Sequence, residues 1–212
     1  MKALPEFPSV SVEPMYEMIK GAEVFALLKA AVDLHVFDYF VHPETAENFA
    51  ERVGIGRSLC PKFFNALVAT GFLVRKEFKY VNTELASIYL TQDSPFYQGN
   101  LLSLMEQSLE SRWAKLLGCL KGDVSRPERK EEHIFNNRFI IAMAEGAMRG
   151  GLFKCQRILM QLPQFSSAKT LLDLGGGPGL YASAFAQANE NLRCVVFDLP
   201  AVLEVAREYI AR

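Results

Sequence analysis

The chain has 212 residues, of which half are hydrophobic and 22% are charged, and its formal net charge at pH 7 is −1. This composition excludes an intrinsically disordered chain, because disordered chains are poor in apolar residues and rich in unbalanced charge. The near balance of charges also argues against a broad basic surface for nucleic acid or for anionic lipid. The sequence has no run of about 18 apolar residues and no apolar segment of a secretory signal peptide near its start. We therefore predict a globular cytoplasmic protein that binds neither nucleic acid nor membrane.

Cysteines and histidines are few and scattered along the chain. They are Cys60, Cys119, Cys155, Cys194, His35, His42 and His133. No two cysteines have the Cys-x-x-Cys spacing, and the histidines do not have the spacing of metal ligands. We predict reduced thiols, most of them buried, and no metal site.

The first predicted element is a helix over residues 14–40, in which apolar residues recur at helical spacing. These residues cover most of the helix surface, a wider band than a helix with one buried face needs. Two interpretations remain open: a central core helix, or a helix that a second subunit partly buries. The second interpretation depends on the family resemblance described below.

Residues 43–90 have the order of a winged helix, with two short helices joined by a turn and then a hairpin over residues 73–83. Thr45 and Ser58 are the predicted N-caps of the two helices, and Gly71 is the predicted stop of the second.

A winged helix invites a DNA-binding interpretation, which the charges oppose. The would-be recognition helix offers only Arg57 and Lys62 before two phenylalanines. Two cations hold a phosphate backbone poorly, because this affinity grows with the number of phosphates neutralised. A packing module is therefore favoured over a DNA-binding regulator.

Residues 97–120 continue as a helix with one apolar face, formed by Trp113, Leu116, Leu117 and Leu120. The polar segment 121–132, which contains Pro127, is the best linker candidate. We accordingly predict two domains, over residues 1–122 and 123–212. One or two helices follow the linker, with Arg-Gly-Gly at residues 149–151 as the candidate interruption.

The most informative stretch is "LLDLGGGPG", which begins at Leu171 and follows the pattern of a strand that runs into a glycine loop. A helix-like segment comes next, so the stretch has the form of a βαβ unit that presents backbone N–H groups to a cofactor. A dinucleotide loop would have a further glycine where Leu180 stands, and a Walker loop would end in Gly-Lys-Ser/Thr, which is absent. Pro178 also lacks the N–H that a pyrophosphate cradle uses. The remaining pattern, Gly-x-Gly-x-Gly, is typical of sites for S-adenosylmethionine.

A second predicted strand supports this interpretation, because it ends at Asp198, 19 residues after Gly179. A carboxylate at the tip of this strand is placed to accept hydrogen bonds from both ribose hydroxyls. The alternative is a tight turn followed by an aspartate that caps a helix. The acid Asp173 inside "LLDL", together with Asp198, favours the cofactor site.

The motifs "LLDLGGGPG" and "VVFDLPAVLEVAR" resemble those of the small-molecule O-methyltransferases related to the plant phenolic and acetylserotonin enzymes. Upstream, "TAENFAERVGIGRSLCPKFFNALVATGFL" is similar to the winged-helix dimerisation region of that family. "SRWAKLLGCLKGD" and "FNNRFIIAMAEGA" are similar to its Trp-led helix and to its Phe-x-x-x-Met helix. The resemblance therefore spans essentially the whole chain, in order.

The resemblance implies a mainly helical N-terminal dimerisation domain with a winged helix, then the first βαβ part of a Rossmann-like methyltransferase domain. It also implies a homodimer through the N-terminal helices, S-adenosylmethionine as the cofactor and a small molecule as the substrate. The cofactor-binding residues expected from the motifs are Asp173, Gly175, Gly177, Gly179, Asp198, Leu199, Phe139 and Met143. In the family pattern the three glycines face the methionine part, Asp198 the ribose and Leu199 the adenine. Phe139 and Met143 would lie near the methyl sulfonium.

The sequence departs from the family at its C-terminal end. The family's domain continues with a second acid near the adenine, a lysine and a histidine that deprotonates the substrate, and none of these is matched here. We therefore expect no catalytic residue in this chain and interpret it as a fragment whose first strand has one unpaired edge. The alternative is a short protein whose open edge is covered by a partner or a swapped subunit.

Three functions are compatible with these observations. The leading hypothesis is that the parent protein methylates a small hydroxylated molecule of aromatic or polyketide-like type, using S-adenosylmethionine. The first alternative is a dimerisation or interaction module without catalysis of its own. The second is a winged-helix regulator that binds DNA, which the scarcity of basic residues disfavours.

Overall fold

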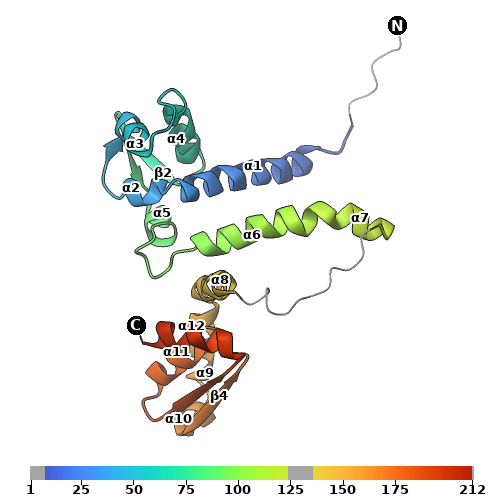
Figure 1. Cartoon of the computed structure of the whole chain (residues 1–212), viewed down its shortest axis with the longest axis vertical. Helices are drawn as coiled ribbons and strands as arrows, with labels where there is room; N and C mark the ends of the chain where they lie inside the picture. Colours follow the sequence, from blue (N-terminus) through green and yellow to red (C-terminus); the bar gives the residue numbers. More distant parts are fainter. Residues whose placement is uncertain (1–7, 124–135, 212) are drawn as a thin grey trace. The chain divides into compact units, whose positions relative to one another are not determined.

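The computed structural model describes residues 8–123 and 136–211 (Figure 1), and these residues divide into two compact units between Thr91 and Gln92. The predicted domain boundary at 122/123 falls inside the second unit, and it stays a prediction. Most of the predicted linker, including Pro127, and His133 lie outside the described residues. None of the described helices is long and apolar enough to cross a membrane.

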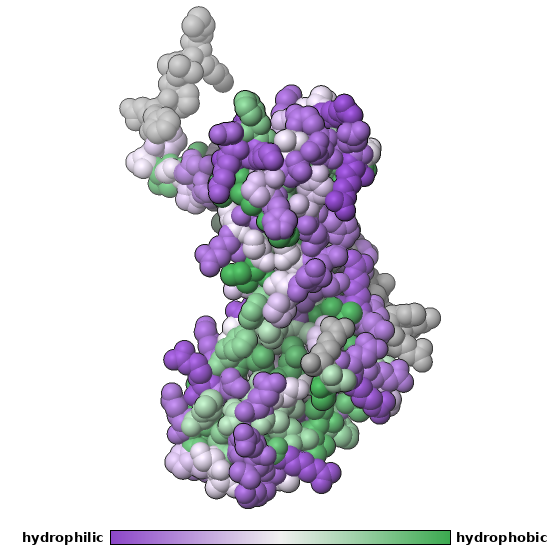
Figure 2. Space-filling model, turned by 90° about the vertical axis from the view of Figure 1, so that its left-hand side faces the viewer, coloured by the Kyte–Doolittle hydropathy of each residue, from purple (hydrophilic) through white to green (hydrophobic). Residues whose placement is uncertain are grey.

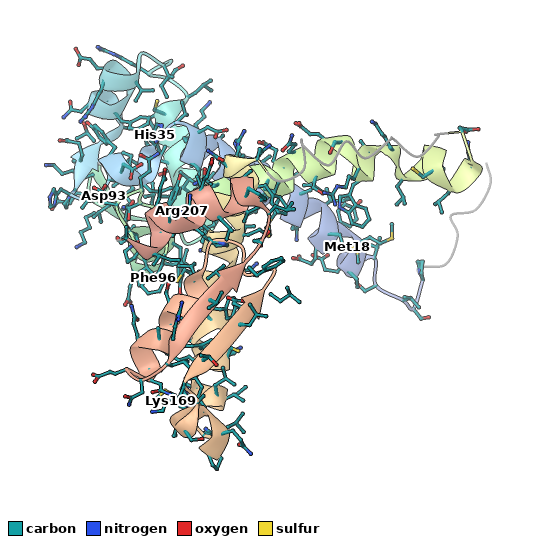
Figure 3. The ribbon with its side chains drawn as sticks, turned by 60° about the horizontal axis from the view of Figure 1, so that its bottom comes forward. Met18, His35, Asp93, Phe96, Lys169 and Arg207 are labelled. Carbon is teal, nitrogen blue, oxygen red and sulfur yellow. The ribbon has the colours of Figure 1, made fainter. Side chains whose placement is uncertain are left out.

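The N-terminal unit opens with α1 (Glu13–Asp33) and α2 (Val36–Tyr39) in place of the single predicted helix. The break falls at His35, whose φ of 54° is left-handed, a conformation that the apolar pattern does not reveal. The core-helix interpretation holds for the C-terminal end of α1, where Ala31 and Val32 are buried. At its other end Met18 is 77% exposed and points away from the helix (Figure 3).

The rest of this unit follows the predicted order of two helices and a hairpin. Its elements are β1 (Glu44–Thr45), α3 (Ala46–Val53), α4 (Cys60–Ala69), β2 (Leu73–Lys76), β3 (Lys79–Asn82) and α5 (Glu84–Tyr89). The three strands form an antiparallel sheet in the order β1-β3-β2. Thr45 caps α3 as predicted, since its hydroxyl accepts the N–H of Asn48 at 3.3 Å. The Ser58 prediction is wrong, because α4 starts at Cys60 and its N-cap residue is Leu59.

Four phenylalanines build the core of the N-terminal unit. They are Phe37, Phe40, Phe49 and Phe64, each with no exposed surface. The ring of Phe40 stacks on Phe49 at 5.6 Å and meets Phe64 edge-on at 4.9 Å, measured between ring centroids. Such pairs contribute about 0.5–1.5 kcal/mol each beyond the burial of their area. The aromatic residues of α3 and α4 therefore serve packing.

The C-terminal unit begins with helices. They are α6 (Gly99–Ser111), the 3₁₀ turn η1 (Trp113–Lys115), α7 (Leu116–Lys121), α8 (Asn137–Met148), α9 (Gly151–Leu159) and α10 (Pro163–Ser167). The predicted interruption at residues 149–151 is confirmed, since Gly150 separates α8 from α9 with a φ of 123°. The 97–120 segment is not one helix, because η1 interrupts it.

A buried carboxylate fixes α8 against the start of α6. Glu145 is 8% exposed, and its carboxylate accepts hydrogen bonds from the side chain of Asn100 at 2.6 Å and the backbone N–H of Leu101 at 2.8 Å. Burial raises the pKa of the Glu145 carboxyl above its ordinary range, although the hydrogen bonds from Asn100 and Leu101 oppose this shift. The position of α8 matters because this helix forms one wall of the site described below.

The unit closes with a βαβα segment: β4 (Thr170–Leu174), α11 (Leu180–Ala188), β5 (Arg193–Phe197) and α12 (Pro200–Ile210). The strands β4 and β5 are parallel, with Thr170 opposite Arg193 and Leu174 opposite Phe197. The predicted strand over residues 170–174 is therefore confirmed. Helix α11 packs on the sheet and on α9, around a cluster that contains Phe165 and Phe185.

One face of this two-stranded sheet is exposed among the described residues. Its apolar side chains are Leu172, Leu174, Val195 and Phe197, which are 63%, 74%, 44% and 62% exposed. Parallel sheets are usually covered on both faces. Figure 2 shows hydrophobic surface, in green, between hydrophilic side chains over the C-terminal part of the chain.

The prediction that most cysteines are buried is wrong. All four thiols are free, but only Cys60 is buried, while Cys119 is exposed and Cys155 and Cys194 are partly exposed. Hydrophobicity of the residue type alone did not reveal that Cys119 lies on the exposed helix α7.

Candidate cofactor site

The glycine loop turns back over the ends of both parallel strands. The backbone N–H of Gly175 donates to the carbonyl oxygen of Phe197 at 2.7 Å, which ties the start of the loop to the end of β5. Gly175, Gly177 and Gly179 all have positive φ values, of 70°, 55° and 75°. A residue with a side chain is strained in this conformation. The spacing that sequence analysis singled out therefore marks the three left-handed positions of the loop.

Gly176 is required for a different reason. A Cβ atom there would lie 2.8 Å from Cγ of Asp173 and 2.8 Å from Cγ1 of Val196. Carbon atoms in contact normally lie about 3.5–4.0 Å apart. Gly176 thus lets the loop lie directly on the two strands, a role that sequence analysis missed because the motif treats this position as free.

Asp198 holds the loop from the end of β5. One carboxylate oxygen accepts the N–H of Gly177 at 2.8 Å, and the other accepts the N–H of Leu199 at 2.7 Å. A carboxylate has about four acceptor positions, so both oxygens keep capacity for a further donor. The predicted neighbour of the loop is therefore in contact with it, and it also stabilises the loop conformation.

Asp173 lies beneath the same loop and carries an unsatisfied acceptor. Its Oδ2 atom is buried and has no hydrogen-bond partner among the described residues. Burial raises the pKa of the Asp173 carboxyl, the nearby Asp198 carboxyl raises it further, and a hydrogen bond from the Ala182 backbone opposes the shift. A buried acceptor without a partner is costly to a fold, and such groups cluster at functional sites.

These groups line one cavity of about 320 Å³, within the range usual for small-molecule sites. Its walls come from the glycine loop, α8, α11 and α12. The lining residues are Phe139, Ile140, Met143, Ala147, Asp173, Gly175, Gly176, Gly177, Pro178, Leu180, Tyr181, Asp198 and Val202. The structure thus brings together six of the eight predicted residues from segments up to 59 positions apart.

The other two predicted residues do not line this cavity. Gly179 is buried and serves as the N-cap residue of α11, where a Cβ would lie 2.9 Å from Cδ1 of Ile210. Leu199 is 53% exposed beyond the end of β5. Ile140 and Tyr181 also line the cavity and were not predicted, because an apolar or aromatic residue in the sequence does not show whether it lines a site or packs in a core.

A strand, a glycine loop, a helix and an acid at the tip of the next strand define an α/β domain that binds a nucleotide-type cofactor. Residues 16–92 match the O-methyltransferase dimerisation domain, and residues 127–212 match the O-methyltransferase domain. The chain therefore belongs to the O-methyltransferase family that carries these two domains.

Individual relatives agree with this assignment. The chain is 30% identical over its whole length to an uncharacterised protein of Methanocaldococcus jannaschii, of which it covers 58%. It is 26% identical, over 87% of its length, to the 3-hydroxy-5-methyl-1-naphthoate 3-O-methyltransferase of Streptomyces sahachiroi, of which it covers 54%. The chain thus spans about half the length of these relatives.

Solved structures show the same fold. Human N-acetylserotonin methyltransferase in complex with S-adenosylmethionine superposes with a TM-score of 0.77 at 23% sequence identity. The match covers 96% of this chain and 64% of the human one.

Proposed function

We propose that this chain supplies the dimerisation region and the cofactor site of a methyltransferase that uses S-adenosylmethionine. The methyl acceptor is a hydroxyl group on a small aromatic or polyketide-like molecule. The observation that carries the proposal is the single cavity in which the glycine loop, Asp173, Asp198 and α8 meet. The family assignment and the naphthoate-modifying relative support an oxygen acceptor on a small aromatic molecule.

The residues present fit this cofactor. Its ammonium group is a donor for the buried, unpartnered Oδ2 atom of Asp173, and its ribose hydroxyls are donors for the spare acceptor positions of Asp198. Phe139 offers an aromatic ring to a positively charged sulfonium, an attractive arrangement that contributes about 0.5–2 kcal/mol. Leu199 stays a proposed neighbour of the adenine, and Gly179 a proposed support of the loop.

The cofactor supplies an electrophilic methyl group when it is bound. The chain would orient the bound cofactor, because the glycine loop and the carboxylates of Asp173 and Asp198 would hold it while α8 lines the side of the cavity that faces the methyl group. The residues Ile140, Met143 and Val202 give this side of the cavity an apolar lining. Among the described residues the cavity lining includes no histidine, and His35 and His42 belong to the N-terminal unit, while His133 lies outside the described residues. We therefore propose that the chain alone binds the cofactor without turning it over.

We also propose that the N-terminal unit forms a homodimer, the role that its match to a dimerisation domain suggests. The exposed apolar residues of α1, including Met15, Met18 and Ile19, provide the surface. For the chain by itself, an interaction module without catalysis is the alternative description, and the exposed face of β4 and β5 favours it.

The test is calorimetric titration with S-adenosylmethionine. Asp198→Ala removes an acceptor of charge-assisted hydrogen bonds, each of which contributes about 1.5–3 kcal/mol, so we expect the dissociation constant to rise well over tenfold. Glu190→Ala is the matched control, because Glu190 is an exposed acid of the same unit outside the cavity. An unchanged dissociation constant for Asp198→Ala would remove Asp198 from the site. Methyl transfer to a panel of hydroxylated aromatics by the chain alone would overturn its non-catalytic description.

A further inference from the structure

A second cavity of about 540 Å³ adjoins the cofactor cavity within the C-terminal unit. It lies between the last turns of α6 and the first turn of α8. Phe139 lines both cavities. A molecule in the second cavity would therefore be separated from the proposed site of the methyl group by the ring of one residue.

The charged side chains that line this second cavity, among residues 8–123 and 136–211, all have one sign. Arg112, from the end of α6, and Arg138, from the start of α8, both line it, and no carboxylate of these described residues does. Among the described residues neither guanidinium has an ion pair or a hydrogen-bond partner. Two arginines on one cavity repel each other, and an anion between them would relieve this repulsion and take up their planar donor groups.

The remaining walls suit an aromatic acid. Leu104, Met105 and Phe139 provide apolar surface for a ring. The Oδ1 atom of Asn136 accepts the backbone N–H of Phe139 at 2.9 Å, which turns the amide oxygen toward the helix and leaves the Nδ2 group as a donor. Ser108 adds a hydroxyl group. Cations, neutral donors and an apolar wall are the complement of a ring that bears a carboxylate.

We propose that this cavity binds the carboxylate of the methyl acceptor, which makes the acceptor a hydroxylated aromatic carboxylic acid. Arg112 and Arg138 pair with the carboxylate, and the ring packs against Phe139 so that the hydroxyl group faces the cofactor cavity. This assignment rests on the proposed methyltransferase function and adds to it the charge of the substrate and the residues that select it.

The test compares two probes that differ by one carboxylate, 3-hydroxy-2-naphthoate and 2-naphthol, in fluorescence titrations of the whole chain in the presence of S-adenosylhomocysteine. We expect the naphthoate to bind at least tenfold more tightly. Arg112→Gln and Arg138→Gln should each weaken naphthoate binding at least fivefold and leave 2-naphthol binding unchanged. Arg149→Gln is the control, because Arg149 is an exposed arginine at the other end of α8. Both target arginines are exposed, so unfolding temperatures should not change.

Equal affinity for the two probes, or naphthoate binding that is insensitive to both arginine substitutions, would overturn the assignment. Titration with S-adenosylhomocysteine alone separates this failure from a failure of the proposed function. Cofactor binding without carboxylate selectivity refutes only the acceptor site. Carboxylate selectivity without cofactor binding retains the anion site and refutes the methyltransferase assignment.

Discussion

Gly176→Ala tests whether the glycine loop lies directly on the strands. The new Cβ would stand 2.8 Å from Cγ of Asp173 and 2.8 Å from Cγ1 of Val196, and the φ of Gly176 is not left-handed, so the overlap is the main penalty. Neither neighbour can withdraw freely, because both side chains belong to paired strand residues. Overpacking of this kind costs about 1–3 kcal/mol. For a chain of this size the unfolding temperature falls by about 2–4 °C per kcal/mol, which predicts a decrease of about 2–12 °C.

The assay is thermal unfolding followed by circular dichroism, together with titration of S-adenosylhomocysteine. Gly146→Ala is the matched control, because Gly146 is inside α8 and its new Cβ would meet only Cδ2 of Leu101 at 3.9 Å. Alanine is favoured over glycine by about 1 kcal/mol inside a helix, so this variant should be as stable as the wild type or more so. We expect Gly176→Ala to lose stability and cofactor affinity together. An unfolding temperature and an affinity like those of the wild type would refute the loop geometry.

Three further predictions concern the carboxyl groups of Asp173 and Glu145 and the exposed apolar side chains of α1. The pKa of Asp173 is raised in the folded state, so its stabilising contribution is present at low pH and is lost as the pH rises through the raised pKa. Urea titrations above about pH 4 should therefore show the free energy of unfolding falling with pH in the wild type, and falling less in Asp173→Asn. The Asp173→Asn variant should nevertheless bind the cofactor more weakly. Glu145→Ala leaves the N–H of Leu101 and the Asn100 amide without their acceptor, so we expect the free energy of unfolding in urea to fall by about 1–3 kcal/mol. A loss no larger than that of the exposed control Glu190→Ala would contradict the role of Glu145 in fixing α8 against α6. Met18→Lys places a charge on the proposed dimer surface of α1 and should shift the chain toward monomer in sedimentation equilibrium, whereas an unchanged dimer population would exclude this surface.

Local signals in the sequence predicted the elements that depend on neighbouring residues. The strand Thr170–Leu174 was predictable because an apolar run ends at glycines, and the cap at Thr45 because its hydroxyl acts three residues away. The left-handed His35 that divides α1 from α2 was not predictable, since its conformation has no counterpart in the apolar pattern. The predicted N-cap at Ser58 was wrong because α4 begins two residues later, at Cys60, with a proline in its first turn.

In the candidate site, too, local sequence signals predicted some residues and not others. The positive φ values at Gly175 and Gly177 follow from a motif of fixed spacing, and the position of Asp198 follows from the parallel register of β5 on β4. The need for glycine at residue 176 was not predicted, because an added Cβ would collide with Val196, which lies 20 residues further along the chain. The cavity with Arg112 and Arg138 depends on how α6 and α8 pack, and a sequence pattern does not encode that packing.

The most direct test of the proposed cofactor site is a two-dimensional NMR titration of the isotope-labelled chain with S-adenosylhomocysteine. We expect the amide resonances of Gly175, Gly177 and Asp198 to shift and saturate, while those of Gly54 and Gly71 in the N-terminal unit stay in place. No shift in the glycine loop, or shifts confined to the N-terminal unit, would contradict the assignment of this cavity as the cofactor site.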